Sequence, residues 1–196
     1  MLFRSDMDII ASAKPDFLGV NYYATATVSA SRNDGTDCQA RNGDQQVMLG
    51  EEGVYRAARN DYLEQTEFGW LVDSIGLRVT LRRIYDRYHL PLLITENGLG
   101  AKDELSADGK VHDPYRIDYL QRHFHQAQLA ISDGVALIGY CPWAFIDLVS
   151  THQGYKKRYG FVYVDRDEED IKALKRIRKD SFYWYREVIR NNGCKE

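Results

Sequence analysis

The chain has 196 residues, and its 26 Lys and Arg against 29 Asp and Glu give a formal net charge of −3. Because a protein that neutralises many phosphates along a nucleic acid carries a strongly basic balance, this charge argues against a nucleic-acid partner. A sequence that is 44% hydrophobic and 28% charged is typical of a folded domain and excludes a disordered or fibrous chain.

The cysteines and the N-terminus indicate a cytoplasmic location. Cys38, Cys141 and Cys194 are odd in number and lack CxxC spacing, so they predict neither a disulfide framework nor a metal site, and we expect reduced thiols. Charged residues from Arg4 onward interrupt the apolar stretch that a signal peptide needs. The uncharged stretch 135–146 has 12 residues, short of the roughly 18 that span a bilayer, so we expect no membrane span.

The first element in chain order is a predicted strand at residues 17–23. This apolar run lacks the polar alternation of a half-exposed strand, which indicates burial on both faces. Residues 24–70 follow, rich in Ser, Asn, Asp and Gly. We expect a single long loop there, far longer than an ordinary connection and of the kind that is usually functional or disordered.

Two helices and two further strands alternate after this loop. Apolar residues three and four apart predict a helix near 77–88, and another that has Asp113 as N-cap and Pro114 as its first residue. Short apolar runs predict strands at 92–95 and 136–145. The order strand, helix, strand, helix, strand is typical of a parallel sheet joined by right-handed crossovers.

The last third of the chain predicts a short strand and a final helix. Residues 159–164 alternate aromatic, Gly and Val, and an apolar stripe over 182–189 indicates a helix. We interpret the basic run 172–179 as a solvated segment. The sequence contains no repeat or linker, which indicates one domain or part of one.

Polar and aromatic residues follow each of the three main strands, where βα proteins place their sites. They are Asn21 to Tyr23, Thr95 to Gly98, and Trp143 with residues 146–150. Glu96, directly after an apolar run, is expected to lie partly shielded from water, where a carboxylate can serve as nucleophile or base. The spacing leaves open a second interpretation, in which Glu96 caps the turn before Gly98.

Three motifs in this order resemble the C-terminal part of a family 1 glycoside hydrolase, from about residue 15 to 193. The motif Ile-Thr-Glu-Asn-Gly at 94–98 resembles the family's nucleophile signature. The segment 16–23 resembles the barrel strand before it, and Pro142-Trp143 resembles the last barrel strand. The resemblance implies an α/β fold that is the C-terminal part of a (β/α)8 TIM barrel. It further implies about three βα units, incomplete as a single chain, with residues 1–196 as one partial domain.

The resemblance also implies a retaining mechanism with Glu96 as nucleophile. Retaining glycosidases place a second carboxyl group about 5 to 5.5 Å away as acid and base. Tyr23 matches the tyrosine that hydrogen-bonds the nucleophile and stabilises its charged form. Asn21 would contact sugar hydroxyls or help position the carboxylate, and Trp143 would form the aromatic floor of the sugar site. The alternative for Trp143 is a buried core residue.

Residues 150–160 resemble the 6-phospho-β-glycosidase branch. Ser150, Lys157 and Tyr159 match its phosphate-binding set, whereas enzymes for neutral sugars have a Glu at the position of Ser150. A carboxylate there would repel a phosphate, and a hydroxyl with a nearby Lys would hold one. Thr151, where the galactoside enzymes have Trp, favours 6-phospho-glucosides. The alternative interpretation of 156–158 is a solvated basic turn.

The sequence contains no Asn-Glu-Pro, the motif that supplies the acid/base in this family. We therefore expect the chain alone to be inactive, to need no cofactor or metal, and to associate with itself or with an N-terminal barrel half, because three strands cut from a barrel expose two edges. The leading hypothesis is a 6-phospho-β-glucosidase acting on phosphorylated β-glucosides. The alternatives are a β-glucosidase for neutral sugars and a non-catalytic or partner-binding relic of a barrel.

Overall fold

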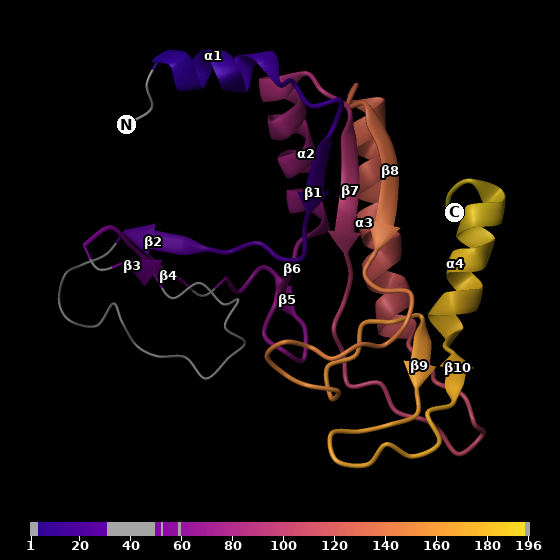
Figure 1. The fold of residues 1–196 in the computed structure, drawn as a ribbon. Helices are drawn as coiled ribbons and strands as arrows, with labels where there is room; N and C mark the ends of the chain where they lie inside the picture. The colour runs from indigo at the N-terminus through magenta and orange to yellow at the C-terminus, as the bar shows by residue number, and fades with distance from the viewer. Residues whose placement is uncertain (1–3, 31–49, 52, 59, 195–196) are drawn as a thin grey trace.

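The central feature is a three-stranded parallel sheet (Figure 1). The structure, a computed structural model, describes residues 4–30, 50–51, 53–58 and 60–194. Strands β1 (Leu18–Asn21), β7 (Leu92–Asn97) and β8 (Leu137–Pro142) lie in the order β1-β7-β8, and both pairs are parallel. The predicted strand order and the parallel sheet are therefore confirmed.

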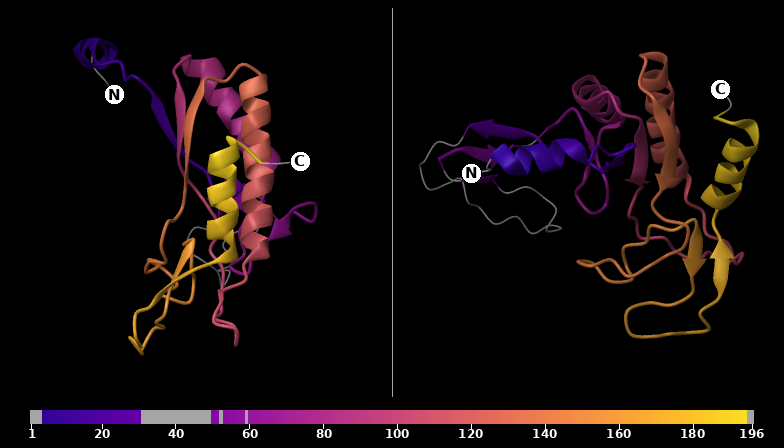
Figure 2. Two further views of the ribbon diagram at one scale, coloured as in Figure 1. Left: turned by 90° about the vertical axis from the view of Figure 1, so that its right-hand side faces the viewer. Right: turned by 45° about the horizontal axis from the view of Figure 1, so that its top comes forward.

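Helices α2 (Ser74–Tyr88) and α3 (Pro114–Ser132) connect these strands, and both cover the same face of the sheet (Figure 2). Their apolar stripes meet the strands in one core, where Leu77 and Leu81 of α2 pack with Leu92 and Ile94 of β7. All four side chains are fully buried. Burying such residues is the main favourable term that holds helices to a sheet.

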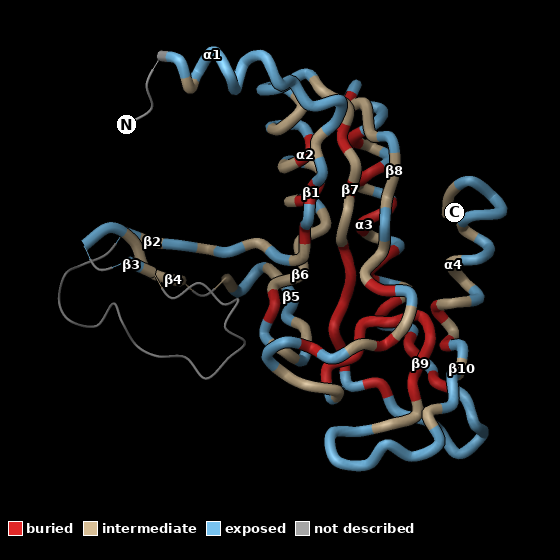
Figure 3. The backbone as a smooth tube through the Cα atoms, in the orientation of Figure 1, coloured by how far each residue is buried: buried red, intermediate tan, exposed pale blue. Residues whose placement is uncertain are grey.

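The other face and the outer edges of the sheet carry no neighbouring strand within the described residues. Tan and pale blue tubes along β1 and β8 mark this exposure (Figure 3). Ile138 on β8 is 60% exposed and Phe145 beyond it is 66% exposed. The strand residues that were expected to be buried on both faces are therefore covered on one face only, as expected for strands taken from a barrel.

The expectation of one long loop at 24–70 is wrong where the structure describes it. Short strands β2 (Val28–Ala30), β4 (Tyr55–Ala57) and β3 (Gly50–Glu51) form an antiparallel sheet, and β5 (Glu64–Gln65) pairs with β6 (Leu71–Val72). Pairing of this kind satisfies backbone groups that an irregular excursion would leave to water. Strands of two or three residues could not be predicted in a segment so rich in turn-forming residues, because they are too short to show an alternating pattern.

A further helix was not predicted. Helix α1 (Arg4–Ser12) precedes β1, and its Ile9 and Ile10 are 67% and 56% exposed. Its few apolar residues are too short a run for a clear 3.6-residue period. Of the cysteines, Cys141 and Cys194 are free thiols, and Cys38 lies outside the described residues.

The C-terminal third forms a hairpin and a last helix. Strands β9 (Val162–Val164) and β10 (Arg176–Arg178) are antiparallel, and α4 (Asp180–Asn191) packs on α3 through Phe124 and Tyr185. The strands predicted at 136–145 and 159–164 are both shorter than expected. Ala144 instead pairs with Tyr159 and Phe161 through backbone bonds of 3.1 and 3.0 Å, which draws both segments out of the main sheet. Among the described residues, none of the helices combines the length and apolarity needed to cross a membrane.

Candidate active site

A cavity of about 160 Å³ opens where β1, β7 and the segment after β8 meet. It is lined by Tyr23, Trp70, Glu96, Trp143, Leu148, Val149, Ser150, Thr151 and Tyr159. Five of the seven side chains singled out in the sequence therefore line one cavity, at the carboxyl ends of parallel strands.

Tyr23 and Glu96 form one wall of this cavity, which we call the nucleophile wall after the role that the sequence predicts for Glu96. The Tyr23 hydroxyl donates a hydrogen bond of 2.8 Å to Glu96 Oε2. Burial, followed by this bond to Glu96, raises the pKa of Tyr23 far above its usual value, so the phenol remains a donor. Glu96 lies within β7, and its described side-chain hydrogen bond is to Tyr23 and not to the turn before Gly98.

Asn97 fixes the end of β7 behind the nucleophile wall. It is fully buried, and its amide nitrogen donates to the Tyr22 carbonyl at 2.7 Å and to the Tyr119 hydroxyl at 3.1 Å. The Tyr140 hydroxyl donates to its amide oxygen. One side chain thus joins β7 to the segment after β1, to α3 and to β8, and a buried amide satisfied on both sides is rigid.

Asn21 is not brought into the cavity. It pairs with Glu96 in the register of β1 and β7, but its side chain is exposed and accepts a hydrogen bond of 2.5 Å from the Thr95 hydroxyl. Residues two apart on a continuous strand point to the same face, so Asn21 and Tyr23 can diverge only if the strand ends between them. Strand β1 does end at Asn21.

Aromatic rings form the floor of the cavity. Trp143 is half-buried and lines it, so the alternative of a buried core tryptophan is wrong. Trp70, which the sequence did not single out, is only 6% exposed and meets Tyr23 edge to face at a centroid distance of 5.3 Å. Its indole nitrogen is buried with no hydrogen-bond partner among the described residues. The sequence feature that could have identified Trp70 is its position directly after Gly69, as a lone Trp in a polar stretch.

Ser150 and Tyr159 form the third side of the cavity. Together with Lys157, which does not line the cavity, they make up what we call the phosphate wall, after the role that the sequence predicts for these residues. Ser150 and Tyr159 line the cavity and are 7% and 8% exposed. The Lys157 side chain is fully buried, with its ammonium 3.7 Å from the centre of the Trp70 ring and 5.6 Å from that of Tyr159. The solvated-turn interpretation is therefore wrong for Lys157, and Lys156 alone is exposed in that turn.

Two glycines let the segment after β7 approach these residues. A Cβ on Gly98 would lie 1.9 Å from the Trp143 carbonyl oxygen, and one on Gly100 would lie 2.5 Å from Lys157 Cε. No other residue fits at such distances without displacing the backbone or the buried lysine.

Six charged side chains beneath the phosphate wall form what we call the buried ion cluster. They are Asp103, Asp113, Arg116, Asp147, Arg158 and Lys179. Lys179 donates to Asp103 and, at 2.7 Å, to Asp147. Burial and then the Arg116 charge lower the pKa of Lys179. Burial opposes ionisation of Asp103, but Arg116 and Lys179 hold its pKa below the usual value.

The residues of the buried ion cluster test two expectations from the sequence, of which the solvated basic run is wrong and the N-cap position of Asp113 is confirmed. Lys179 is fully buried, so the basic run 172–179 is not solvated at its end. The Lys179 ammonium forms ion pairs there with the carboxylates of Asp103 and Asp147. Asp113 is the N-cap residue of α3, but its side chain makes no cap bond. It accepts instead from the Arg116 guanidinium at 2.9 Å and the Ser181 hydroxyl at 2.6 Å, which are stronger donors for a buried carboxylate.

Comparison with known proteins places this geometry in a family. The sequence matches the family model described as Glycosyl hydrolase family 1 over residues 2–194. The chain belongs to glycosyl hydrolase family 1. The same family was expected from the three sequence motifs, and its TIM-barrel fold accounts for the parallel strands with helices on one face.

Among family 1 relatives, the chain is 53% identical to aryl-phospho-β-D-glucosidase BglC of Bacillus subtilis, over 96% of this chain and 40% of that protein. It is 44% identical to 6-phospho-β-glucosidase AscB of Escherichia coli, over 95% of this chain and 37% of that protein. It is also 38% identical to β-glucosidase A of Thermotoga maritima, over 99% of this chain and 38% of that protein. The chain thus spans about two-fifths of the length of these relatives.

A solved family 1 β-glucosidase from Thermotoga maritima has the same fold. The TM-score is 0.81 at 36% identity, over 98% of this chain and 38% of that one. The three βα units of the described structure are therefore part of a family 1 barrel, and the cavity lies at the end of that barrel where the strands finish.

Proposed function

We propose that this chain supplies the nucleophile and the phosphate-binding residues of a retaining 6-phospho-β-glucosidase. The observation that carries the proposal is the hydrogen bond of 2.8 Å from Tyr23 to Glu96, in a cavity that Ser150 also lines. A carboxylate held in line by a phenol suits attack on an anomeric carbon, and a hydroxyl donor suits a phosphate oxygen.

In the proposed reaction a Glu96 oxygen bonds to the anomeric carbon, while the bond from that carbon to the leaving oxygen breaks and the leaving oxygen takes a proton. Water then hydrolyses the glycosyl ester and regenerates the carboxylate. The proton must come from a second carboxyl group. Because the sequence lacks Asn-Glu-Pro, we propose that this group comes from another part of a barrel, and that the chain alone does not turn over.

The phosphate wall is the basis for the substrate class. The Lys157 ammonium lies beside Trp70 and Tyr159, next to the cavity that Ser150 and Tyr159 line. A buried ammonium with hydroxyl donors matches a phosphate in charge and hydrogen bonding. The β-glucosidase relative keeps a neutral-sugar enzyme as the second candidate, but no carboxylate stands at position 150 to hold sugar hydroxyls.

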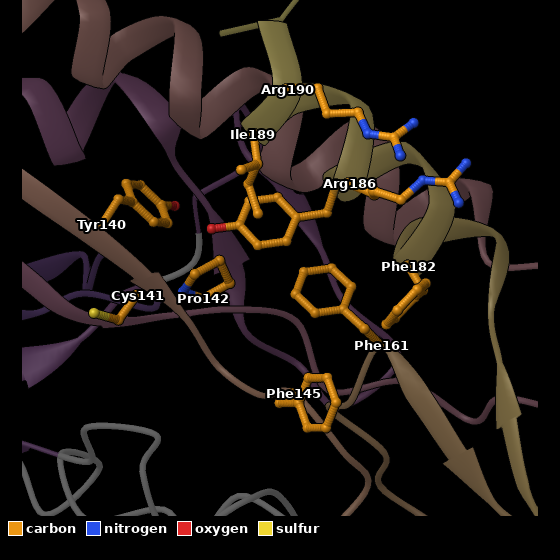
Figure 4. A pocket seen from close by; sticks show the side chains of 10 residues that line it. Tyr140, Cys141, Pro142, Phe145, Phe161, Phe182, Arg186, Ile189 and Arg190 are labelled. Carbon is orange, nitrogen blue, oxygen red and sulfur yellow. The ribbon is translucent and has the colours of Figure 1, made fainter. Parts of the chain in front are cut away.

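An apolar groove between β8 and α4 suggests where the rest of the barrel docks (Figure 4). It has a volume of about 640 Å³. It is lined by Tyr140, Cys141, Pro142, Phe145, Phe161, Phe182, Tyr185, Arg186, Ile189 and Arg190. Because β8 carries no strand on its outer side among the described residues, and a barrel of eight strands closes on itself, we propose that an amino-terminal barrel half fills this groove.

Two measurements test the proposal. The chain is co-expressed with the amino-terminal three-fifths of BglC and treated with 2,4-dinitrophenyl 2-deoxy-2-fluoro-6-phospho-β-glucoside, whose good leaving group needs little protonation. We expect a covalent label on Glu96 by peptide mass mapping. A label on another carboxylate, or none, would contradict the assignment.

We also propose a cytoplasmic location, which accords with the free thiols Cys141 and Cys194. Fractionation of cells that produce the chain tests this location.

The docking site has its own matched pair of variants. Ile189 in the groove is 64% exposed and Ile171 outside it is 57% exposed, so Asp at either position should leave the chain folded. We expect Ile189→Asp to weaken association with the amino-terminal half about tenfold or more, as for a central apolar anchor, and Ile171→Asp to leave it unchanged. If the groove instead mediates dimers of this chain, light scattering of the chain alone will show them.

A further inference from the structure

We propose that Asp147 is a positioning residue that sets the geometry of the phosphate wall. The inference rests on the proposed function, because it concerns the 147–160 loop, which carries Ser150, Lys157 and Tyr159. Asp147 lies outside the cavity lining, three residues before Ser150, and its carboxylate points into the buried ion cluster.

The contacts of Asp147 join the two ends of the 147–160 loop. Oδ1 accepts the Gly160 backbone N–H at 2.9 Å and the Lys179 ammonium at 2.7 Å. Oδ2 accepts the Arg158 guanidinium at 3.0 Å. Since Arg158 and Gly160 flank Tyr159, this one carboxylate ties the start of the loop to its last three residues.

A second set of bonds carries this anchor to Lys157. The Arg158 backbone pairs with Ala101 through two bonds of 2.8 and 2.9 Å, which hold the chain beside Gly100. The Lys157 side chain packs against Gly100, where a Cβ would lie 2.5 Å from Lys157 Cε, and the Arg158 guanidinium also donates to the Val164 carbonyl at 2.9 Å. The direction of Lys157 thus depends on where Arg158 is held.

The chemistry of the site requires a carboxylate at 147. Its side chain is completely shielded from solvent, and it faces two cations and two backbone N–H groups, those of Gly160 and, at 3.4 Å, Val164. An amide of the same shape offers a single acceptor oxygen and turns an NH₂ group toward Arg158 or Lys179. Removing one partner of a buried ion pair leaves the other charge uncompensated, so the loop must shift to reach water.

Asp113 offers a matched control within the same cluster. Its side chain is equally shielded and also pairs with an arginine, through the Arg116 bond of 2.9 Å. Its other partner is Ser181 at the start of α4, and it makes no described contact with the 147–160 loop. Asp113→Asn therefore imposes a similar burial penalty, and it reaches the loop only indirectly, through the Arg116 guanidinium, which lies 3.4 Å from the Tyr159 and Arg158 carbonyl oxygens.

The first test follows amide hydrogen exchange of the full chain by NMR and needs no substrate. In Asp147→Asn we expect exchange at Gly160 and Ser150 to accelerate about tenfold or more, while β7 amides keep their rates. In Asp113→Asn we expect acceleration at Ser181 and none at Gly160. If Asp147→Asn does not fold, Asp147→Glu serves in its place, because it keeps the charge but moves the carboxylate. In that folded variant, hydrogen exchange at the Gly160 amide should also accelerate. Unchanged Gly160 exchange in the folded variant would overturn the inference.

The second test separates positioning from general support of the fold. In the barrel assembled with the amino-terminal half, Asp147→Asn should raise KM for 4-nitrophenyl 6-phospho-β-glucoside about tenfold and change kcat less than about threefold. Activity on the unphosphorylated glucoside, and KM in Asp113→Asn, should stay within about twofold. Equal losses on both substrates would overturn the inference. An assembled wild type without preference for the phosphorylated substrate would overturn the proposed function instead, with the exchange result still deciding whether Asp147 anchors the loop.

Discussion

The nucleophile wall and the phosphate wall face the same cavity but are held by different forces. Glu96 is placed by strand pairing, because it lies opposite Asn21 in the parallel pair of β1 and β7, and one direct hydrogen bond joins it to Tyr23, two residues past the end of β1. Ser150, Lys157 and Tyr159 lie on a loop that no long strand supports. Buried charges support it instead, through Asp147, Arg158 and Lys179.

Under the proposed function, this difference separates chemistry from substrate specificity within one barrel. Strand register fixes a carboxylate against its neighbour with little freedom, which suits a reaction centre. A loop held by ion pairs can change its residues without breaking a strand ladder, and buried pairs specify one arrangement of their partners more than they add net stability. The predictions below act on one wall at a time.

The largest effect is expected from the nucleophile wall. In the assembled barrel, Glu96→Gln should lower kcat by about 10⁴-fold or more on phosphorylated and neutral substrates alike, because the covalent step has no nucleophile. Steady-state kinetics with both substrates measure this. The control is Glu67→Gln, since Glu67 is exposed and accepts only a backbone N–H of Lys102 at 2.8 Å in the described structure. Substantial activity in Glu96→Gln would remove Glu96 from the mechanism.

The next largest effect is expected on stability, when the Lys179 charge that supports the phosphate wall is removed. Lys179→Met should lower the free energy of unfolding by about 3 to 5 kcal/mol, because Asp103 and Asp147 lose a buried cation between them. Urea unfolding of the chain measures it. Lys172→Met is the control, since Lys172 pairs with Asp167 in solvent and its loss should have no measurable effect. Similar midpoints for the two variants would mean that the buried ion cluster does not hold this region.

Removing one hydroxyl sharpens the distinction between the walls. Tyr23→Phe should lower kcat about 10- to 100-fold on both substrates, as expected for loss of a hydrogen bond to a charged group, and should leave their activity ratio unchanged. Parallel kinetic assays on the two substrates give that ratio. A change in the ratio would show that Tyr23 also acts on the phosphate side.

The smallest effect is a pH dependence on the strand and helix side. Burial lowers the pKa of His123 to about 4, whereas the unfolded chain has the ordinary value near 6.5. Between these values the unfolded state binds more protons, so stability falls as pH falls, by up to about 1.4 kcal/mol per pH unit. Urea unfolding between pH 7 and 4 should show this slope, and His123→Gln should flatten it. His125→Gln, on the exposed face of α3, should not.

The strand and helix order could be predicted from the sequence because periodicity reports burial directly. The motif residues Glu96, Tyr23 and Ser150 were found because they follow strand ends or match a family pattern. Trp70 and the buried ion cluster were not found. Their partners are distant in the chain, as Lys179 is from Asp103 and Asp147, and a charged residue carries no local sign that it will be buried.

The central claim is that the phosphate wall selects phosphorylated glucosides, and the ratio of kcat/KM for phosphorylated over neutral substrate tests it most directly in the assembled barrel. Lys157→Ala should lower kcat/KM for the 6-phospho substrate about 10- to 100-fold, the value of a charge-assisted contact, and leave the neutral glucoside nearly unaffected. Ser150→Glu should lower the ratio further, because it removes a donor, repels the dianion and restores a group that can bind sugar hydroxyls. Equal losses on both substrates in the two variants would show that these residues support only the fold and would contradict the assignment.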